Sequence, residues 1–232
     1  MVFEFTIHDS RFTMIHAVLF DLDGTFADTA SDLCYAVNLM RIARGLPPVP
    51  DEKTRPVTSS GARGLLGAGF GITPDHADYP AMRDEFLNLY QAHLCRETRL
   101  FDGMAALVDA LEARAMTWGI VTNKAERFAL PLMTLLGYGT RAACVIGGDT
   151  TGKLKPHPDP LYAAARAIGI AASACVYVGD DERDIQAGRA AGMKTIAVRY
   201  GYLNGSDPAA WGADAVVDHP LDVLQHLQPP GY

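Results

Sequence analysis

Short apolar runs alternate with amphipathic segments along most of the chain. Six runs, each ending in polar or glycine-rich residues, lie at 17–20, 117–121, 143–146, 175–178, 195–198 and 215–217. They are uniformly apolar rather than alternating, which is typical of strands covered on both faces of a parallel sheet. Helical patterns lie between them, at 103–114, 124–136, 158–168 and 184–191. This alternation predicts a doubly wound, Rossmann-like α/β core.

Residues 30–99 break the alternation. They carry no strong strand signal, but amphipathic helical patterns at 31–46 and 81–97 flank a glycine- and serine-rich stretch at 57–76. We therefore expect a small helical unit inserted after the first strand, with turns and short helix in its middle. The core domain would comprise residues 14–29 and 100–232, the insert 30–99, and residues 1–13 a possible N-terminal extension.

Composition and charge narrow the class of protein. The 232 residues are 49% hydrophobic and 20% charged, which suits a soluble globular chain. No apolar run approaches the length of a membrane span, so we expect no membrane partner. The net charge of −7, with scattered basic residues, disfavours nucleic-acid binding. A small metabolite is the expected partner, and both a monomer and a homodimer remain open.

The cysteines and the N-terminus indicate a compartment. Four cysteines lie far apart in the sequence, which predicts free thiols in a reducing environment rather than disulfides or a metal knuckle. The first residues lack the basic start and apolar block of a secretory signal. We therefore expect a cytoplasmic protein.

Polar residues gather where the predicted strands end. They are carboxylates, a hydroxyl, an amide and lysines: Asp21, Asp23, Thr122, Asn123, Lys124, Lys155, Asp180, Asp181 and Asp184. Ligands of open parallel sheets bind outside the carboxyl ends of the strands. These side chains are thus expected at one edge of the sheet.

Four segments carry a resemblance to a known family. FDLDGT (20–25), VTNK (121–124), KPHPDP (155–160) and VGDDERDIQAGRAAG (178–192) resemble the ordered motifs of the haloacid dehalogenase superfamily. The insert is similar in position to the cap of the phosphoglycolate phosphatase-like branch. The resemblance implies a phosphatase with a small helical cap after the first strand.

The resemblance also implies roles in phosphoryl transfer. Asp21 would be the nucleophile that forms an aspartyl-phosphate, and Asp23 would protonate the leaving group and then deprotonate water. A crowded acidic site would help Asp23 to hold that proton. The Thr122 hydroxyl, the Asn123 backbone amide and Lys155 would bind the phosphoryl group.

A divalent metal follows from the same resemblance. Mg²⁺ would be held by the carboxylates of Asp21 and Asp180 and by the backbone carbonyl of Asp23. Asp184 would orient metal-bound water or hold Lys155.

Four further positions have more ordinary interpretations. An aspartate after a strand commonly caps a helix, and we expect Asp181 to be solvated or capping. Lys124 could reach the substrate, but a solvated lysine is the default expectation. Phe26 and Ala27 stand where Leu and Val are common in the family, so we expect different packing of the hinge into the cap.

The cap loop should choose the substrate. Its candidates are Ser59, Ser60, Gly61 and Arg63, and Arg63 is either a bidentate partner of a substrate carboxylate or a surface arginine. We predict a small carboxylate-bearing phosphate ester, with 2-phosphoglycolate first. The chain is also similar to N-acetylmuramic acid 6-phosphate phosphatases, whose substrate carries a carboxylate too, so Arg63 does not discriminate between them.

Other activities on this core are less favoured. A sugar-phosphate mutase would form an isomer without free phosphate. A dehalogenase lacks the second aspartate of the DxD pair, and a non-catalytic binding module usually loses an essential carboxylate or lysine. The chain retains both Asp23 and Lys155, which favours hydrolysis.

Overall fold

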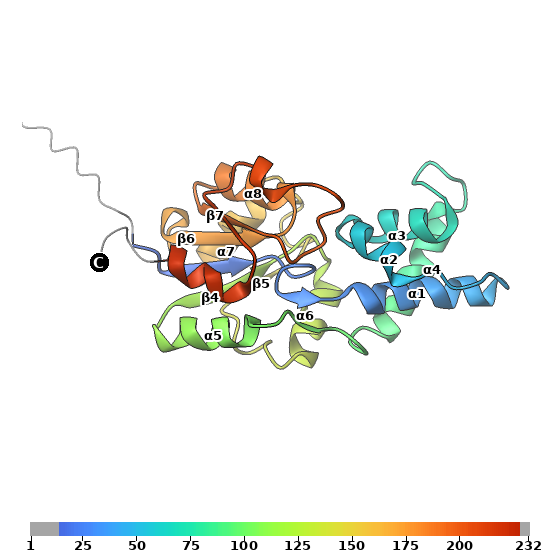
Figure 1. Cartoon of the computed structure of the whole chain (residues 1–232), viewed down its shortest axis with the longest axis horizontal. Coiled ribbons are helices and arrows are strands. Elements are labelled where there is room, and N and C mark those ends of the chain that lie inside the picture. Colours follow the sequence, from blue (N-terminus) through green and yellow to red (C-terminus); the bar gives the residue numbers. More distant parts are fainter. Residues whose placement is uncertain (1–13, 228–232) are drawn as a thin grey trace, which may run out of the picture.

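The computed structural model describes residues 14–227 (Figure 1), so the extension predicted at 1–13 lies outside the described residues. A six-stranded parallel sheet forms its centre, in the order β5-β4-β1-β6-β7-β8. The strands are β1 (Ala17–Phe20), β4 (Thr117–Val121), β5 (Val145–Ile146), β6 (Cys175–Gly179), β7 (Lys194–Val198) and β8 (Ala215–Val217). The predicted doubly wound core is confirmed, although β5 is shorter than the apolar run that predicted it.

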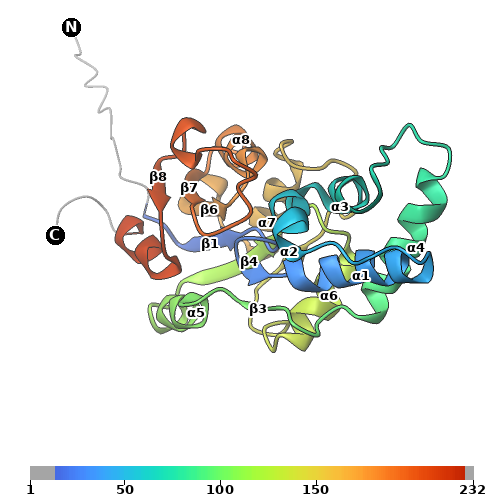
Figure 2. The ribbon, with the colours of Figure 1, turned by 45° about the vertical axis from the view of Figure 1, so that its right-hand side comes forward.

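Helices cover both faces of the sheet (Figure 2). They are α5 (Met104–Ala113), α6 (Glu126–Leu135), α7 (Asp159–Ile168) and α8 (Glu182–Ala190). Val18 and Phe20 of β1 pack in one core cluster with α5 and α6, whereas Ala17 and Leu19 pack in another with α7 and α8. Because successive strand residues point to opposite faces, a strand buried on both faces must be apolar throughout.

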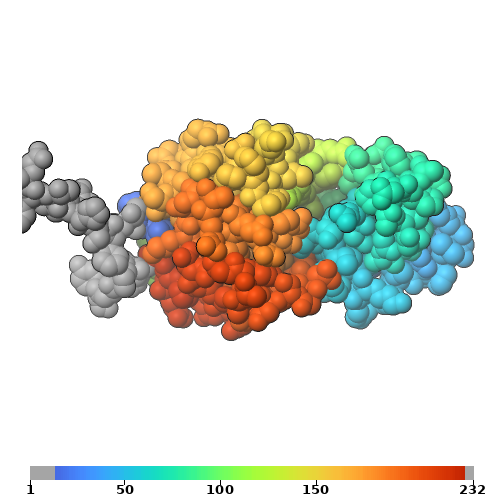
Figure 3. All heavy atoms as spheres, turned by 90° about the horizontal axis from the view of Figure 1, so that it is seen from above, coloured from blue at the N-terminus to red at the C-terminus, as the bar shows by residue number. Residues whose placement is uncertain are grey.

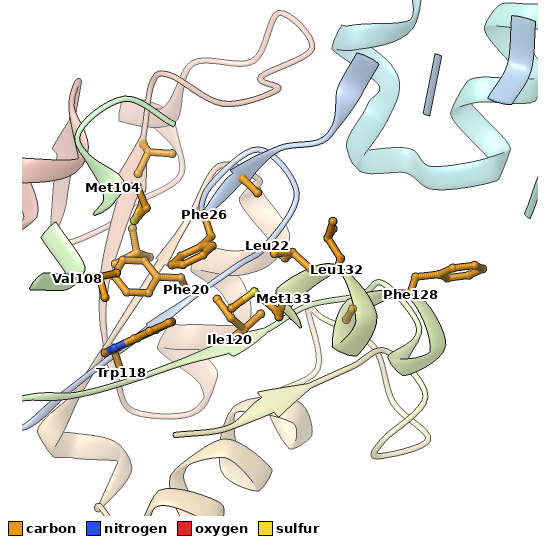
Figure 4. Packing of buried hydrophobic residues seen from close by; sticks show 14 of the residues in the cluster. Phe20, Leu22, Phe26, Met104, Val108, Trp118, Ile120, Phe128, Leu132 and Met133 are labelled. Atoms are coloured by element: carbon orange, nitrogen blue, oxygen red, sulfur yellow. The ribbon is translucent and has the colours of Figure 1, made fainter. Parts of the chain in front are cut away.

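The aromatic cluster beside β1 includes Phe26 of the hinge. Its ring stacks on Trp118 at 5.4 Å between centroids and meets the edge of Tyr138 at 5.6 Å. Figure 4 shows Phe26 close to Phe20 and Trp118, and its side chain is fully buried. Phe26 thus anchors the start of the hinge in the core, and the adjacent Ala27 is also fully buried.

The insert forms a separate helical layer at one end of the molecule (Figures 1 and 3). It contains α1 (Ala30–Ala43), α2 (Asp51–Thr54), a 3₁₀ helix (Arg55–Ser60), α3 (Gly61–Phe70) and α4 (Tyr79–Ala92). Two short strands, β2 (Ala27–Asp28) and β3 (Arg99–Leu100), pair in antiparallel fashion where the chain enters and leaves the insert. The apolar pattern did not predict this two-stranded hinge.

The stretch expected to form turns and short helix contains a ten-residue helix, α3. Two of its four glycines lie where no side chain fits: a Cβ on Gly69 would come within 2.5 Å of Val37, and one on Gly64 within 2.5 Å of the Val57 carbonyl oxygen. Close packing against α1 and the preceding 3₁₀ helix therefore outweighs the low helix propensity of glycine. The helix ends at Gly71, whose φ of 70° suits a left-handed cap.

Two expectations from composition can be checked over residues 14–227. No helix in this range is long and apolar enough to cross a membrane. All four cysteines are free thiols, as predicted, and Cys34 and Cys175 are buried.

Candidate active site

Three neighbouring strands deliver functional residues to one edge of the sheet. β1 lies between β4 and β6, and Phe20 is in register with both Ile120 and Val178. Asp21, Thr122 and Asp180 therefore leave the sheet at nearly the same level, and the Asp21 amide still donates to the Val178 carbonyl at 2.9 Å. The structure thus brings these predicted residues together.

Lys155 lies at the centre of this edge and is only 4% exposed. Its ammonium donates to Asp21 Oδ1 at 2.8 Å and to the Tyr177 hydroxyl at 2.7 Å, and it lies 2.7 Å from Asp184 Oδ1. Burial alone lowers the pKa of Lys155, but the two carboxylates outweigh it and raise that pKa above its usual value. Lys155 is therefore a fixed positive charge beside Asp21.

Tyr177 is a contact that the sequence analysis missed. Its hydroxyl donates to the Val121 carbonyl at 2.6 Å and receives a hydrogen bond from Lys155. Its phenol is the one polar side-chain group in the run CVYV, and that is the signal that would have identified it. Tyr177 thus holds the Lys155 ammonium from its position in β6, within the sheet.

Asn123 fixes the loop that carries Lys155. Its side-chain amide donates to the Lys155 carbonyl at 3.0 Å and accepts from the Lys155 amide at 2.9 Å. Thr122 is 2% exposed, and its hydroxyl accepts from the Lys124 amide at 3.2 Å. The side chain of Asn123 therefore orients Lys155. The sequence had suggested a role only for the Asn123 backbone amide, as a donor to the phosphoryl group.

Three buried carboxylates, from Asp21, Asp180 and Asp184, place one oxygen each within 4.8 Å of the others. Burial, and then the nearby charge of Asp21, raises the pKa of Asp180 well above its usual value. Burial raises the pKa of Asp184 to about 7, even though Lys155 opposes the shift. Carboxylates that resist ionisation in this way would be stabilised by a cation, and oxygen donors suit a hard divalent ion. The cluster can hold a metal.

Asp23 has a cation rather than another carboxylate as its partner. Lys124 Nζ lies 2.9 Å from both of its oxygens, and the Thr29 hydroxyl donates to Oδ1 at 2.6 Å. The Lys124 side chain is 8% exposed and lies 4.7 Å from the centre of the Tyr90 ring of α4. The expectation of a solvated lysine was wrong because the cap helix covers it. The crowding of acids expected around Asp23 occurs instead at Asp180 and Asp184.

Asp181 caps helix α8, which confirms its ordinary interpretation. Its side chain accepts from the Arg183 amide at 2.9 Å, and its own amide donates to Asp184 Oδ2 at 3.1 Å, completing a capping box. The capping box also fixes Asp184, whose other oxygen contacts Lys155. Arg183 reaches the cap by donating to the Ser59 carbonyl at 2.9 Å.

A cavity of about 620 Å³ separates the cap from this edge of the core. Its core wall includes Asp21, Asp23, Thr122, Asn123, Lys155 and Asp184. Its cap wall includes Ser59, Ser60, Gly61, Phe86, Leu87 and Tyr90. The predicted cap residues at 59–61 are therefore brought opposite the carboxylates.

Arg63 is the cap candidate that the structure does not bring to this cavity. It is exposed and lines a neighbouring groove with Gly67 and Thr73, which shares Ser60 and Arg183 with the cavity. Gly61 and Ala62, which begin α3, face the cavity, and the helical rotation of about 100° per residue turns Arg63 to another side. Three other arginines line the cavity: Arg83 from α4, Arg127 from α6 and Arg183 from α8. Their spacing gave no signal, because charged positions of an amphipathic helix usually face solvent.

Comparison with known proteins agrees with this geometry. A family model described as haloacid dehalogenase-like hydrolase matches residues 18–198. The chain belongs to this family. This haloacid dehalogenase-like hydrolase is 46% identical over 214 residues to an N-acetylmuramic acid 6-phosphate phosphatase of Pseudomonas aeruginosa, covering 92% of this chain and 95% of that protein. The resemblance inferred from the four motifs is confirmed.

Further relatives share the fold and the class of enzyme. A phosphoglycolate phosphatase of Xanthomonas campestris pv. campestris is 49% identical to this hydrolase over 205 residues, or 88% of this chain and 92% of that protein. The crystal structure described as a predicted phosphoglycolate phosphatase from Haemophilus somnus matches with a TM-score of 0.82 at 25% identity. That match covers 94% of this chain and 100% of the other. The similar chains therefore carry two different substrate names.

Proposed function

We propose that this hydrolase cleaves a phosphomonoester through an aspartyl-phosphate on Asp21. The observation that carries the proposal is the position of Asp21 at the end of β1, with Lys155 at 2.8 Å and the cavity in front of it. A carboxylate oxygen of Asp21 attacks phosphorus, the bond from phosphorus to the leaving oxygen breaks, and Lys155 offsets the negative charge. Water then attacks phosphorus, which releases phosphate and restores the carboxylate.

Asp23 would move the proton in both halves of the reaction. In the first half its carboxyl gives a proton to the leaving alkoxide, and in the second its carboxylate accepts one from the attacking water. Lys124, at 2.9 Å from both oxygens, would hold the carboxyl group of Asp23 in place.

The phosphoryl group would be bound by Thr122, Asn123 and Lys155. The Thr122 hydroxyl and the Asn123 backbone amide lie in the loop that follows β4, beside Asp21. Phosphoryl transfer depends mostly on such positioned donors and charges. The contact of Lys155 with Asp21 and Asp184 supports its role as the positive charge of this group.

Mg²⁺ is the cofactor that suits the carboxylate cluster. The carboxylates of Asp21 and Asp180 and the backbone carbonyl of Asp23 would hold it, while Asp184 would position Lys155. When bound, the ion neutralises charge on the phosphoryl oxygens. The donors are all oxygens, with no histidine or cysteine in the cluster, as Mg²⁺ prefers.

We propose 2-phosphoglycolate as the first substrate to test, by analogy with the phosphoglycolate phosphatase relatives. Its carboxylate would lie toward Ser59, Ser60 and Gly61, within reach of a cavity arginine. N-Acetylmuramic acid 6-phosphate is the second candidate. The cavity volume of about 620 Å³ and the apolar wall of Phe86 and Leu87 favour it, because a two-carbon ester would leave most of that space to water.

The test compares Asp21→Asn with the unchanged protein on both esters in the presence of Mg²⁺. We expect phosphate release to fall to background in a variant that stays folded, and the larger kcat/KM of the unchanged protein to identify the better substrate. Turnover by folded Asp21→Asn near the original rate would contradict the nucleophile. Formation of an isomer without free phosphate would indicate a mutase instead. Full activity after complete chelation of metal would contradict the proposed requirement for Mg²⁺.

A further inference from the structure

Tyr202 connects the core to the first helix of the cap. It is 3% exposed and lies in the segment that follows β7. Its hydroxyl accepts hydrogen bonds from the amides of Thr29 at 2.7 Å and Ala30 at 3.0 Å, and donates to Asp28 Oδ1 at 2.7 Å. These three residues are the end of β2 and the beginning of α1. One phenol therefore satisfies the polar groups at the entrance to the cap.

This hydroxyl accepts from the amides of the N-cap residue and of the first helical residue of α1, which an ordinary N-cap side chain does not bind. Thr29 is the N-cap residue of α1, a position where a threonine side chain commonly accepts a hydrogen bond from the first turn. Its hydroxyl makes no such bond and instead donates to Asp23 Oδ1 at 2.6 Å. Tyr202 thus fixes the backbone of Thr29, and the Thr29 hydroxyl holds Asp23 instead of capping the helix.

The backbone of Tyr202 holds a second carboxylate of the site. Its amide donates to Asp180 Oδ2 at 2.8 Å, while Thr25 donates to Oδ1 at 2.8 Å. The approach is close, since a Cβ on Gly201 would lie 2.3 Å from the Cβ of Asp180, and one on Gly24 would lie 2.8 Å from the Tyr202 ring. The amide of Tyr202 is therefore fixed against Asp180 by packing as well as by its hydrogen bond.

The cap contributes its own contact to the same residue. The guanidinium of Arg55, from the cap, lies 5.3 Å from the centre of the Tyr202 ring and 2.5 Å from Asp28 Oδ2. The Tyr202 ring is thus bounded by the hinge, the cap and the loop after β1. A rotation of the cap about the hinge would have to break these contacts.

We propose that Tyr202 is a positioning residue that links the orientation of the cap to Asp23 and Asp180. This rests on the proposed function for the roles of the two carboxylates. The hydroxyl sets the start of α1, and through Thr29 it sets the direction of Asp23. The amide fixes the orientation of the Asp180 carboxylate. One residue therefore fixes the cap and the two carboxylates relative to one another.

Tyr202→Phe tests the hydroxyl while it keeps the ring and the amide. Tyr200→Phe is the matched control, because the Tyr200 hydroxyl is buried and has no hydrogen-bond partner among residues 14–227. Kinetics are compared on 2-phosphoglycolate, whose alkoxide needs a proton, and on p-nitrophenyl phosphate, whose phenolate leaves without one. For Tyr202→Phe we expect kcat on the alkyl ester to fall roughly tenfold or more, with a much smaller change on the aryl ester.

Hydrogen exchange of the metal-free protein supplies a readout that needs no substrate. In Tyr202→Phe the amides of Thr29 and Ala30 lose their acceptor and should exchange roughly tenfold faster or more, whereas Tyr200→Phe should leave them unchanged. If the wild-type protein does not hydrolyse phosphoglycolate, the substrate proposal fails, but this exchange result still tests the link.

Three outcomes would overturn the proposal. The first is unchanged amide exchange at Thr29 and Ala30 in Tyr202→Phe. The second is an equal fall in kcat on both esters in that variant. The third is a faster exchange or a selective fall in kcat in Tyr200→Phe that matches Tyr202→Phe. Asp28→Ala removes the acceptor of the Tyr202 hydroxyl and tests the link if Tyr202→Phe does not fold. In Asp28→Ala we expect faster amide exchange and a lower kcat on the alkyl ester, both smaller than in Tyr202→Phe. Wild-type exchange and kcat in Asp28→Ala would contradict the link.

Discussion

The two walls of the cavity are built in different ways. On the core wall, Lys155, Asp21 and Asp184 are almost fully buried and each contacts another charged group within 2.8 Å. On the cap wall, Phe86 is buried, whereas the Arg83 side chain is 52% exposed and pairs with Asp84 at 3.7 Å. The buried charges of the core wall pair with one another, whereas the cap wall is mainly apolar and carries one exposed guanidinium, that of Arg83.

This difference separates chemistry from recognition. A charge removed from the core wall leaves its partners buried and uncompensated, which is costly in a medium of low dielectric constant. Removal of the exposed Arg83 side chain from the cap wall leaves only Asp84 without a partner, and Asp84 is itself exposed to water. Changes in the core should therefore act on kcat and stability together, and changes in the cap should act on KM.

Lys155→Met should show the largest effect. Loss of the buried cation removes the charge that opposes the phosphoryl group, and we expect kcat to fall roughly 10³-fold or more. The same change leaves Asp21 and Asp184 without their positive partner, so the melting temperature should fall as well. Lys153→Met in the same loop is the control, since Lys153 is exposed. A Lys155→Met protein with a tenth or more of the original kcat, as an order of magnitude, would contradict the core-wall argument.

Metal binding should stabilise the protein in a pH-dependent way. In the metal-free protein the pKa of Asp184 is raised by burial from 3.8 to about 7, so the folded state holds this proton more tightly than the unfolded state. The contribution of Asp184 to the free energy of unfolding is therefore greatest below pH 3.8, its usual pKa, and declines as the pH rises toward 7. Metal ions bind the deprotonated cluster, so Mg²⁺ should raise the melting temperature more at about pH 8 than at about pH 5.

Thermal melts with and without Mg²⁺ at both pH values check this prediction. Asp180→Asn is the control, since it removes one carboxylate of the cluster and should reduce the Mg²⁺-dependent shift at the higher pH. An equal shift at the two pH values would show that the bound ion does not depend on these carboxylates.

Two exposed arginines should give the smallest effect and the sharpest contrast. Arg127 lines the cavity and Arg63 lies outside it. We expect Arg127→Gln to raise KM for a carboxylate-bearing ester roughly tenfold, the usual size of a lost charged hydrogen bond, with little change in kcat. Arg63→Gln should leave both constants unchanged, and steady-state kinetics on the same ester compare the two. If KM rises in Arg63→Gln but not in Arg127→Gln, Arg63 rather than Arg127 binds the substrate carboxylate.

The core site was predictable because its residues follow strands directly. Asp21 and Thr122 come immediately after an apolar run, and Asp180 follows one after a single glycine. Parallel strands bring their carboxyl ends to one edge. The helix cap at Asp181 was also local, because its partners lie within three residues. Lys124, Arg63 and Tyr202 could not be placed this way. The surroundings of Lys124 depend on α4, and those of Tyr202 on a hinge more than 170 positions earlier in the chain.

The amino-acid sequence by itself determined the alternation of strands and helices, the family and the set of charged groups at the edge of the sheet. These depend on periodicity and on residues next to one another in the chain. Only the tertiary structure decided that Lys124 pairs with Asp23, that Arg63 faces away and that Tyr202 binds the backbone at the start of the first helix of the insert. Such contacts arise from how the cap packs on the core, and that packing depends on the shapes of two surfaces rather than on any local pattern.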